Sequence, residues 1–246
     1  MSCPRCGGQV RPPGLMHSAW RCPHCGPVAP LHVAEHIGPE IVASTVERII
    51  ADPVADPTVD RVPGLVDRVD RADPSTPPVP LWCPWPLPSA WTITGVGWAG
   101  DDRSGVRATA VACSGPSPLG GGPADLVLVA EEPGVGLGAR LAGTTGIDPG
   151  PELTDALTEA GPGHAERVAP AKVTAGGHPT PLWAVKSPTD RSAYAGEARG
   201  IWLYAITWPA SAGYLLAEDV VLHDLAEWTP SELVYGAPSP YLHGRV

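Results

Sequence analysis

The motifs CPRCGG at residues 3–8 and CPHCGP at residues 22–27 open the chain as a matched pair. Fifteen residues separate Cys6 from Cys22, a spacing typical of zinc sites built from two C-x-x-C pairs. Each pair lets one tight turn aim two thiolates at one ion, and the following glycine can adopt the positive φ that turns backbone N–H groups toward the sulfurs. The motifs therefore predict a zinc ribbon over residues 1–30, with the metal ligands Cys3, Cys6, Cys22 and Cys25.

A site of four thiolates fills the coordination shell of the ion, which predicts one structural Zn²⁺ rather than a catalytic one. Iron is the alternative metal. His17 and His24 are further candidate ligands, but the two cysteine pairs already supply four sulfurs. A segment of about 30 residues cannot fold on a hydrophobic core alone, so the metal is expected to stabilise it.

Residues 3–26 resemble the zinc-ribbon family, and their cysteine turns resemble rubredoxin knuckles. That resemblance implies metal binding and says little about function. The whole chain also resembles an uncharacterised family of high-GC Gram-positive bacteria. Its members join a start of the form CPRCGG…WRCPHCGPVAPLH to a C-terminal domain rich in Trp and Pro, which supports this architecture and implies no activity.

A helix followed by a proline-rich linker is predicted for residues 31–79. Gly38-Pro39-Glu40 has the features of a helix start, and apolar side chains then recur at helical spacing as far as Ile50. Ten prolines lie between Asp52 and Pro88, and they disfavour regular backbone pairing. We therefore expect the ribbon to be a separable module, unless the apolar face of the helix packs on the C-terminal domain.

From residue 80 to 246 the sequence predicts an α+β domain, with a mixed β-sheet and one to three helices. Short apolar runs bounded by Gly, Pro and Asp indicate strands, and strands and helices do not alternate as in a doubly wound fold. The expected strands are Trp91–Trp98, Val106–Cys113, Leu126–Ala130, Arg167–Val173, Leu182–Lys186, Ile201–Trp208 and Tyr214–Ala217. The expected helices are Leu137–Leu141, Pro151–Ala160 and Val220–Trp228, the last capped by Glu218-Asp219.

Composition limits the classes of function. The chain has 246 residues, 43% of them hydrophobic, which is enough for a real core. Its net charge of −10 repels a polyanion, so non-specific binding of nucleic acid is not expected. No uninterrupted apolar run approaches 18 residues, so no membrane partner is expected. Four of the six cysteines form two close pairs, which fits a metal site in a reducing compartment and predicts a cytoplasmic protein.

The glycine-rich loop Gly134–Gly138, with Ala139 after it, matches the G-x-G-x-x-[GA] pattern that holds pyrophosphate at a helix start. Glu131 and Glu132 precede it and would repel phosphate, so an ordinary loop is the preferred interpretation, with both acids in solvent. Trp82, Trp85 and Trp91 form either core or a peptide-binding surface, and core is favoured. Cys83 and Cys113 are expected to be buried thiols. The alternative for them is a nucleophile with a base among His164, His178, His223 and His243.

Two functions remain in competition. The leading hypothesis is a non-enzymatic cytoplasmic protein that uses the ribbon to dock on another protein, with an interaction or regulatory role. The alternative is an enzyme, or a nucleotide or small-ligand binder, with its site in the C-terminal domain near the loop Gly134–Gly138.

Overall fold

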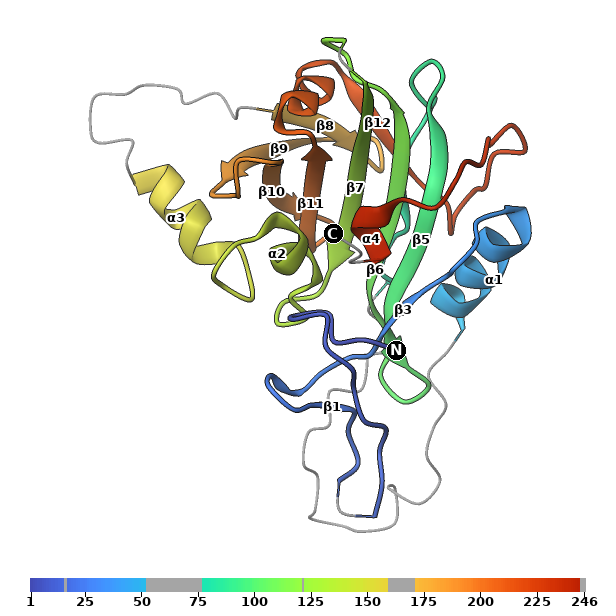
Figure 1. Ribbon diagram of the computed structural model, residues 1–246, viewed down its shortest axis with the longest axis vertical. Coiled ribbons are helices and arrows are strands. Elements are labelled where there is room, and N and C mark those ends of the chain that lie inside the picture. The colour runs from blue at the N-terminus through green and yellow to red at the C-terminus, as the bar shows by residue number, and fades with distance from the viewer. Residues whose placement is uncertain (16, 52–76, 121, 159–170, 244–246) are drawn as a thin grey trace.

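The computed structural model describes residues 1–15, 17–51, 77–120, 122–158 and 171–243. A two-stranded sheet near the N-terminus and a ten-stranded sheet form its framework, and a few short helices pack on the larger sheet (Figure 1). The expected α+β class is confirmed.

The large sheet has the order β3-β5-β6-β7-β11-β10-β9-β8-β12-β4. Its neighbouring strands pair antiparallel, except that β12 runs parallel to β8. The bounds are β3 Leu31–Val33, β4 Trp82–Pro84, β5 Thr92–Asp101, β6 Gly105–Pro116, β7 Pro123–Glu131, β8 Ala171–Ala175, β9 His178–Val185, β10 Ser192–Ala198, β11 Ile201–Trp208 and β12 Val220–Asp224.

The central strands are buried on both faces, which explains their unbroken apolar runs. In β11, Leu203 and Ala205 belong to one core, whereas Tyr204 and Ile206 belong to the other. The sheet curves strongly, so that β4 lies against β6 and β7. Thr109 Oγ1 on β6 donates a hydrogen bond of 2.5 Å to the carbonyl of Pro80, which lies just before β4. This bond holds the start of β4 against β6.

Helices cover both faces of the sheet. Helix α2 (Leu137–Ala142) and helix α4 (Pro240–His243) cover one core. Helix α1 (Pro39–Ile50) and the 3₁₀ helix η2 (Ala210–Ala217) contribute to the other. Helix α3 (Gly150–Thr158) contacts β9.

Helix α1 confirms the helix predicted from the sequence. Pro39 occupies its first turn with Glu40. Val42 and Ile49 are buried in the sheet core, so the apolar face of α1 packs on the C-terminal sheet rather than on a separate partner. The helix therefore packs on the C-terminal domain, which is the alternative to a fully separable ribbon.

Two expected elements are wrong. Residues Val220–Trp228 were expected to form a helix, but β12 occupies Val220–Asp224. The backbone N–H and C=O groups of β12 pair with β8 on one side and with β4 on the other. This tertiary pairing overrides the helical pattern of the sequence. Glu218 follows η2 as its C-cap residue and Asp219 precedes β12, so the pair does not cap a helix that starts at Val220.

The expected strand Tyr214–Ala217 lies instead within η2. β11 ends at Trp208 because Pro209 has no N–H group for a ladder. Ala212 and Leu216 are then buried at a spacing of four, while Tyr214 is exposed. In a strand these three residues would share one face, so an exposed Tyr214 between two buried residues fits a helical turn and not a strand.

The other expected elements agree within a few residues. Strands β5, β6, β7, β9 and β11 and helices α2 and α3 lie where they were predicted, although residues 159 and 160 lie outside the described part. The strand predicted for Arg167–Val173 starts at Ala171 in the described part. Strands β3, β4 and β10 were not predicted. Residues 52–76 of the expected linker lie outside the described residues, and β4 lies in the proline-rich stretch that continues past the linker to Pro88.

Candidate metal centre

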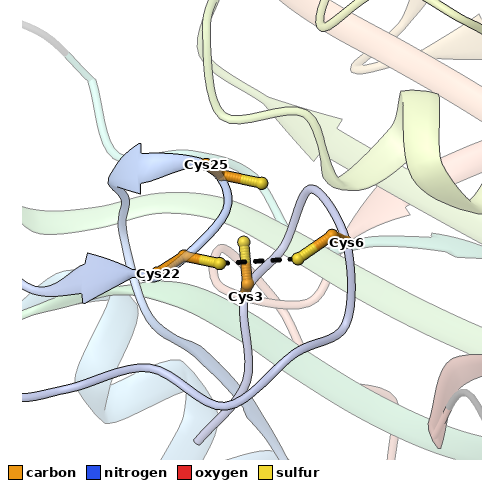
Figure 2. Close-up of side chains that lie close together, drawn as sticks. All are labelled: Cys3, Cys6, Cys22 and Cys25. Atoms are coloured by element: carbon orange, nitrogen blue, oxygen red, sulfur yellow. Dashed lines mark hydrogen bonds between the residues drawn. The ribbon is translucent and has the colours of Figure 1, made fainter.

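Four cysteine sulfurs meet in the N-terminal segment. The Sγ atoms of Cys3, Cys6, Cys22 and Cys25 all lie within 4.8 Å of one another, and Figure 2 shows them pointing toward a common centre. The Sγ atoms of Cys6 and Cys22 are 3.5 Å apart. A tetrahedral ion with metal–sulfur bonds of about 2.3 Å places its sulfurs roughly 3.8 Å apart. The four predicted ligands therefore come together with the spacing that one ion requires.

Each cysteine pair folds as the motif predicts. Gly7 and Gly26 have φ of 75° and 76°, and the N–H of Gly7 donates to the carbonyl of Cys3 at 2.8 Å. Strands β1 (Arg21–Cys22) and β2 (Gly26–Pro27) pair on either side of the second turn. Both glycines lie in the left-handed region, where a side chain would be strained.

Backbone amides of the turns act on the sulfurs. Burial tends to raise the pKa of Cys22, but the N–H groups of Cys25 and His24, together with hydrogen bonds from the thiols of Cys6 and Cys3, lower the pKa to about 6. Burial and the neighbouring thiols of Cys6 and Cys3 raise the pKa of Cys25 to about 12. Four thiols packed this tightly cannot all ionise without a cation, so a bound metal is the natural partner of the set.

The N-terminal segment with the four cysteines is called the ribbon below, and the part of the chain that forms most of the large sheet is called the C-terminal domain. Two arginines join them with hydrogen bonds in opposite directions. Arg5, in the first cysteine turn, donates to the carbonyls of Gly134 (2.6 Å) and Val135 (3.3 Å). Arg140 Nε, on α2, donates to the carbonyl of Pro4 at 2.7 Å. Each arginine thus uses carbonyls of the other unit as acceptors.

The surroundings of Arg140 link this contact to the metal centre. Burial lowers the pKa of Arg140, and the sulfurs of Cys3 and Cys6 act in the opposite direction. A divalent ion with four thiolates carries a net charge of roughly −2. A guanidinium beside such a centre offsets that charge, which explains why a partly buried arginine is tolerated here.

Backbone hydrogen bonds also contribute to the junction, that is, to the contact between the ribbon and the C-terminal domain. Ser2 exchanges hydrogen bonds with Leu31, the first residue of β3. β3 then pairs with β5, so that Leu31 lies opposite Ala99. The chain therefore passes from the ribbon directly into the large sheet.

The glycine-rich loop lies at this junction, and carboxylates of the chain bind its amides. Glu131 Oε2 accepts hydrogen bonds from the N–H groups of Leu137 (2.7 Å) and Gly138 (3.2 Å). The N–H of Gly134 donates to Asp148 Oδ1 at 2.8 Å. The amides that would face a phosphate at the start of α2 are thus already bonded.

Glu131 is fully buried, which corrects the expectation that it lies in solvent. Burial raises its pKa to about 8 against the opposing effect of the Gly138 and Leu137 amides. The sequence did not predict that Glu131 binds these amides, because two adjacent acids before a glycine-rich loop are typical of an exposed turn. Its neighbour Glu132 forms an ion pair with Arg107 at 2.8 Å.

The other candidates take structural roles. Cys83 and Cys113 are fully buried, as expected. A hydrogen bond with Cys83, together with burial, raises the pKa of the Cys113 thiol well above its usual range, which disfavours a nucleophilic thiolate. His164 and the side chain of His243 lie outside the described residues.

Two of the three candidate tryptophans belong to the core. Trp82 and Trp91 are buried, as favoured from the sequence. Trp85 is half-buried and makes an edge contact with the exposed Trp228, with ring centroids 6.0 Å apart. His223 makes a second edge contact with Trp228.

The contacts of Arg5 and Arg140 between the ribbon and the C-terminal domain could not be predicted from the sequence. Arg5 stood out only as a cation in the variable position of the first cysteine turn, and Arg140 only as a basic residue in the last turn of a short helix. Neither pattern identifies a partner. No helix of the described residues has the length and apolarity needed to span a membrane.

Comparison with known proteins identifies a family that covers most of the chain. The model of a family of unknown function, DUF6758, matches residues 1–58 and 53–242. No curated protein and no solved structure matches the chain significantly. The match extends from the cysteine turns to α4, and the chain therefore belongs to the DUF6758 family.

Proposed function

We propose that the protein is a non-enzymatic zinc protein of the cytoplasm, in which one structural Zn²⁺ holds the ribbon in shape as a docking module for another protein. The observation that carries this proposal is the set of four converging sulfurs. Four thiolates leave no open position on the ion for a substrate or an activated water, as catalytic sites require.

Zinc is favoured over iron because a purely structural task needs no redox chemistry, although a tetrahedral set of sulfurs accepts either metal. A reducing compartment is supported by the two close cysteine pairs, which fit a metal site better than a disulfide framework.

A protein partner fits the charge of the chain better than a nucleic acid does. The net charge of −10 opposes the approach of a polyanion. Several side chains of the ribbon are exposed, among them Arg11, Arg21 and His24, and they offer local contacts to a partner.

The alternative is a small-ligand or nucleotide site near the loop Gly134–Gly138. One observation favours it: Gly134 and Val135 line a hollow beside the ribbon. Against it, the amides at the start of α2 already bind Glu131, and this leaves no amide cradle for a phosphate.

The test compares the intact protein with the full-length double variant Cys3→Ser/Cys22→Ser. Elemental analysis should give one zinc per intact chain and almost none in the variant. Affinity capture followed by reciprocal capture with the identified partner should then recover a protein that the variant loses. Tyr214→Ala, on the exposed surface of η2, is the matched control and should retain both zinc and partner. Equal capture by the intact protein and the cysteine variant would refute the docking role.

A further inference from the structure

Two arginines of the ribbon, Arg11 and Arg21, lie directly opposite each other in an antiparallel bridge. The N–H of Arg11 donates to the carbonyl of Arg21 at 2.8 Å, and the N–H of Arg21 donates to the carbonyl of Arg11 at 3.0 Å. Residues that exchange both bonds in this way carry their side chains on the same face, with Cβ atoms about 5 Å apart. Two positive charges held in such a pair repel each other and destabilise it.

The face that carries these two arginines is open to solvent. Side chains alternate along an extended segment, so Arg21 points opposite to its neighbours Trp20 and Cys22. Cys22 points to the metal centre, and Trp20 lines the hollow beside the ribbon. Arg11 and Arg21 are both exposed, and neither lines that hollow. The N-terminal segment also extends away from the large sheet (Figure 1), so a partner can reach this face.

The charges of the two arginines are not compensated within the described part of the chain. Among its residues, neither Arg11 nor Arg21 has an acidic partner or a side-chain hydrogen bond. A loaded metal centre carries a charge of roughly −2, but Arg5 and Arg140 already lie beside it. An anion from another molecule that lies across both exposed guanidinium groups would therefore remove their repulsion.

The anion that fits this face best is a carboxylate-rich stretch of protein. Guanidinium groups bind carboxylates through two parallel hydrogen bonds. Leu15 lies at the closed end of the same hairpin, where Gly14 and His17 form a bridge, and it is fully exposed, at 106%. An exposed leucine on the same hairpin as two arginines favours a partner with both acidic and apolar side chains. A long nucleic acid has no such apolar groups and also meets the net charge of −10.

We propose that the face formed by Arg11, Arg21 and Leu15 binds an acidic segment of the partner protein, with Asp or Glu side chains across the two guanidinium groups and an apolar side chain against Leu15. The proposal rests on the docking function above and names the chemistry of the partner. Charge complementarity selects the occupant, because the two arginines are exposed cations without an acid of their own in the described part of the chain.

Binding at this face should depend on the metal. The two arginines meet through a bridge between segments of the ribbon, and Arg21 directly precedes the candidate ligand Cys22. The ribbon is too short to fold on a hydrophobic core alone, so removal of the ion should separate Arg11 from Arg21. Chelation should therefore abolish binding even where the large sheet remains folded.

The probe is a fluorescently labelled peptide of four glutamates followed by two leucines, titrated into the metal-loaded full-length protein at low and at physiological salt. We expect saturable binding that weakens with salt, about tenfold weaker binding for the double variant Arg11→Gln/Arg21→Gln, and none after chelation. The matched control is Lys172→Gln/Lys186→Gln, which removes the same charge from exposed positions of the C-terminal domain and should bind like the unaltered protein.

Leu15→Ser tests the apolar part of the face. It should weaken binding of the mixed peptide several-fold and leave binding of hexaglutamate unchanged. The mixed peptide with glutamine in place of glutamate is the neutral control. Zinc content and melting curves establish that each variant is loaded and folded.

Any of four results would overturn the proposal: no saturable binding of the mixed peptide, equal binding by Arg11→Gln/Arg21→Gln, no effect of Leu15→Ser, or equally tight binding of a single-stranded DNA dodecamer. Self-association of the loaded chain that the arginine double variant abolishes would identify a second copy as the occupant and would also overturn it.

This proposal and the docking function fail separately. A partner that requires the cysteines but is retained by Arg11→Gln/Arg21→Gln supports the docking function and refutes the acidic-segment site. Saturable, arginine-dependent binding of the mixed peptide without any cysteine-dependent partner supports the site and refutes the docking function.

Discussion

Arg5 and Arg140 form a reciprocal contact: the ribbon arginine donates to carbonyls of the C-terminal domain, and the domain arginine donates to a carbonyl of the ribbon. Both guanidinium groups lie near a metal centre that is negatively charged when loaded. The contact therefore couples the fold of the ribbon to that of the sheet.

Removal of the metal should lower the main melting transition. The ribbon loses its shape without the ion, and Arg5, Arg140 and the bond between Ser2 and Leu31 then lose their partners. With a few net hydrogen bonds at about 1 kcal/mol each, we expect a fall of roughly 5–10 °C. Calorimetry of the full chain with and without chelator measures it. An unchanged transition would instead support the separable module that the proline-rich stretch predicts.

The substitution Arg140→Met should destabilise the junction. It keeps much of the apolar stem but removes the hydrogen bond to Pro4 and the positive charge beside Cys3 and Cys6. We expect a loss of about 1–3 kcal/mol in urea unfolding and a faster release of metal to a coloured chelator. Arg21→Met is the control, because Arg21 is exposed on the ribbon. Identical release rates for both variants would contradict an electrostatic role for Arg140.

Glu131 should make stability fall as pH rises. Its pKa is raised to about 8 in the fold from an ordinary value of 4.5. Between these values the folded chain holds a proton that the unfolded chain has released, so stability decreases from about pH 5 to pH 8 and changes little above pH 8. The shift corresponds to a loss on the order of 5 kcal/mol.

The variant Glu131→Gln isolates this effect, since an uncharged amide oxygen can still accept from Leu137 and Gly138. We expect the variant to resemble the unaltered protein at pH 5 and to exceed its stability at pH 9, measured by urea unfolding. A difference between the two proteins that stays constant with pH would show that Glu131 remains ionised in the fold.

Gly138 should not tolerate a methyl group. A Cβ there would lie 2.2 Å from the ring of Tyr204, and both residues are buried. Gly138→Ala should therefore cost about 1–3 kcal/mol or more, despite the higher helix propensity of alanine. Gly150→Ala, at the start of α3, places its Cβ in open space and should be neutral within about 0.5 kcal/mol. Urea unfolding of the two variants decides it, and equal stabilities would argue against close packing of α2 on β11.

The sequence was most informative where local chemistry decides the structure. The spacing of Cys6 and Cys22 predicted the ligand cluster, and the apolar pattern from Pro39 to Ile50 predicted α1. Val220–Asp224 could not be predicted in the same way, because its strand forms only when β8 and β4 lie on either side of it. Glu131 was missed for a similar reason: its amide partners follow it by six and seven residues, and only the fold removes the water around it.

The position of β12 has a consequence for synthesis on the ribosome. β12 lies between β8 and β4, so Trp82 of β4 finds its strand partner only after Asp224 has been made. The four candidate metal ligands, by contrast, all lie within the first 25 residues. A nascent chain therefore contains the whole candidate metal site long before its sheet can close, with the edges of β4 and β8 open in the meantime. Those open edges are the point at which a stalled or shortened chain would be captured by chaperones or begin to aggregate.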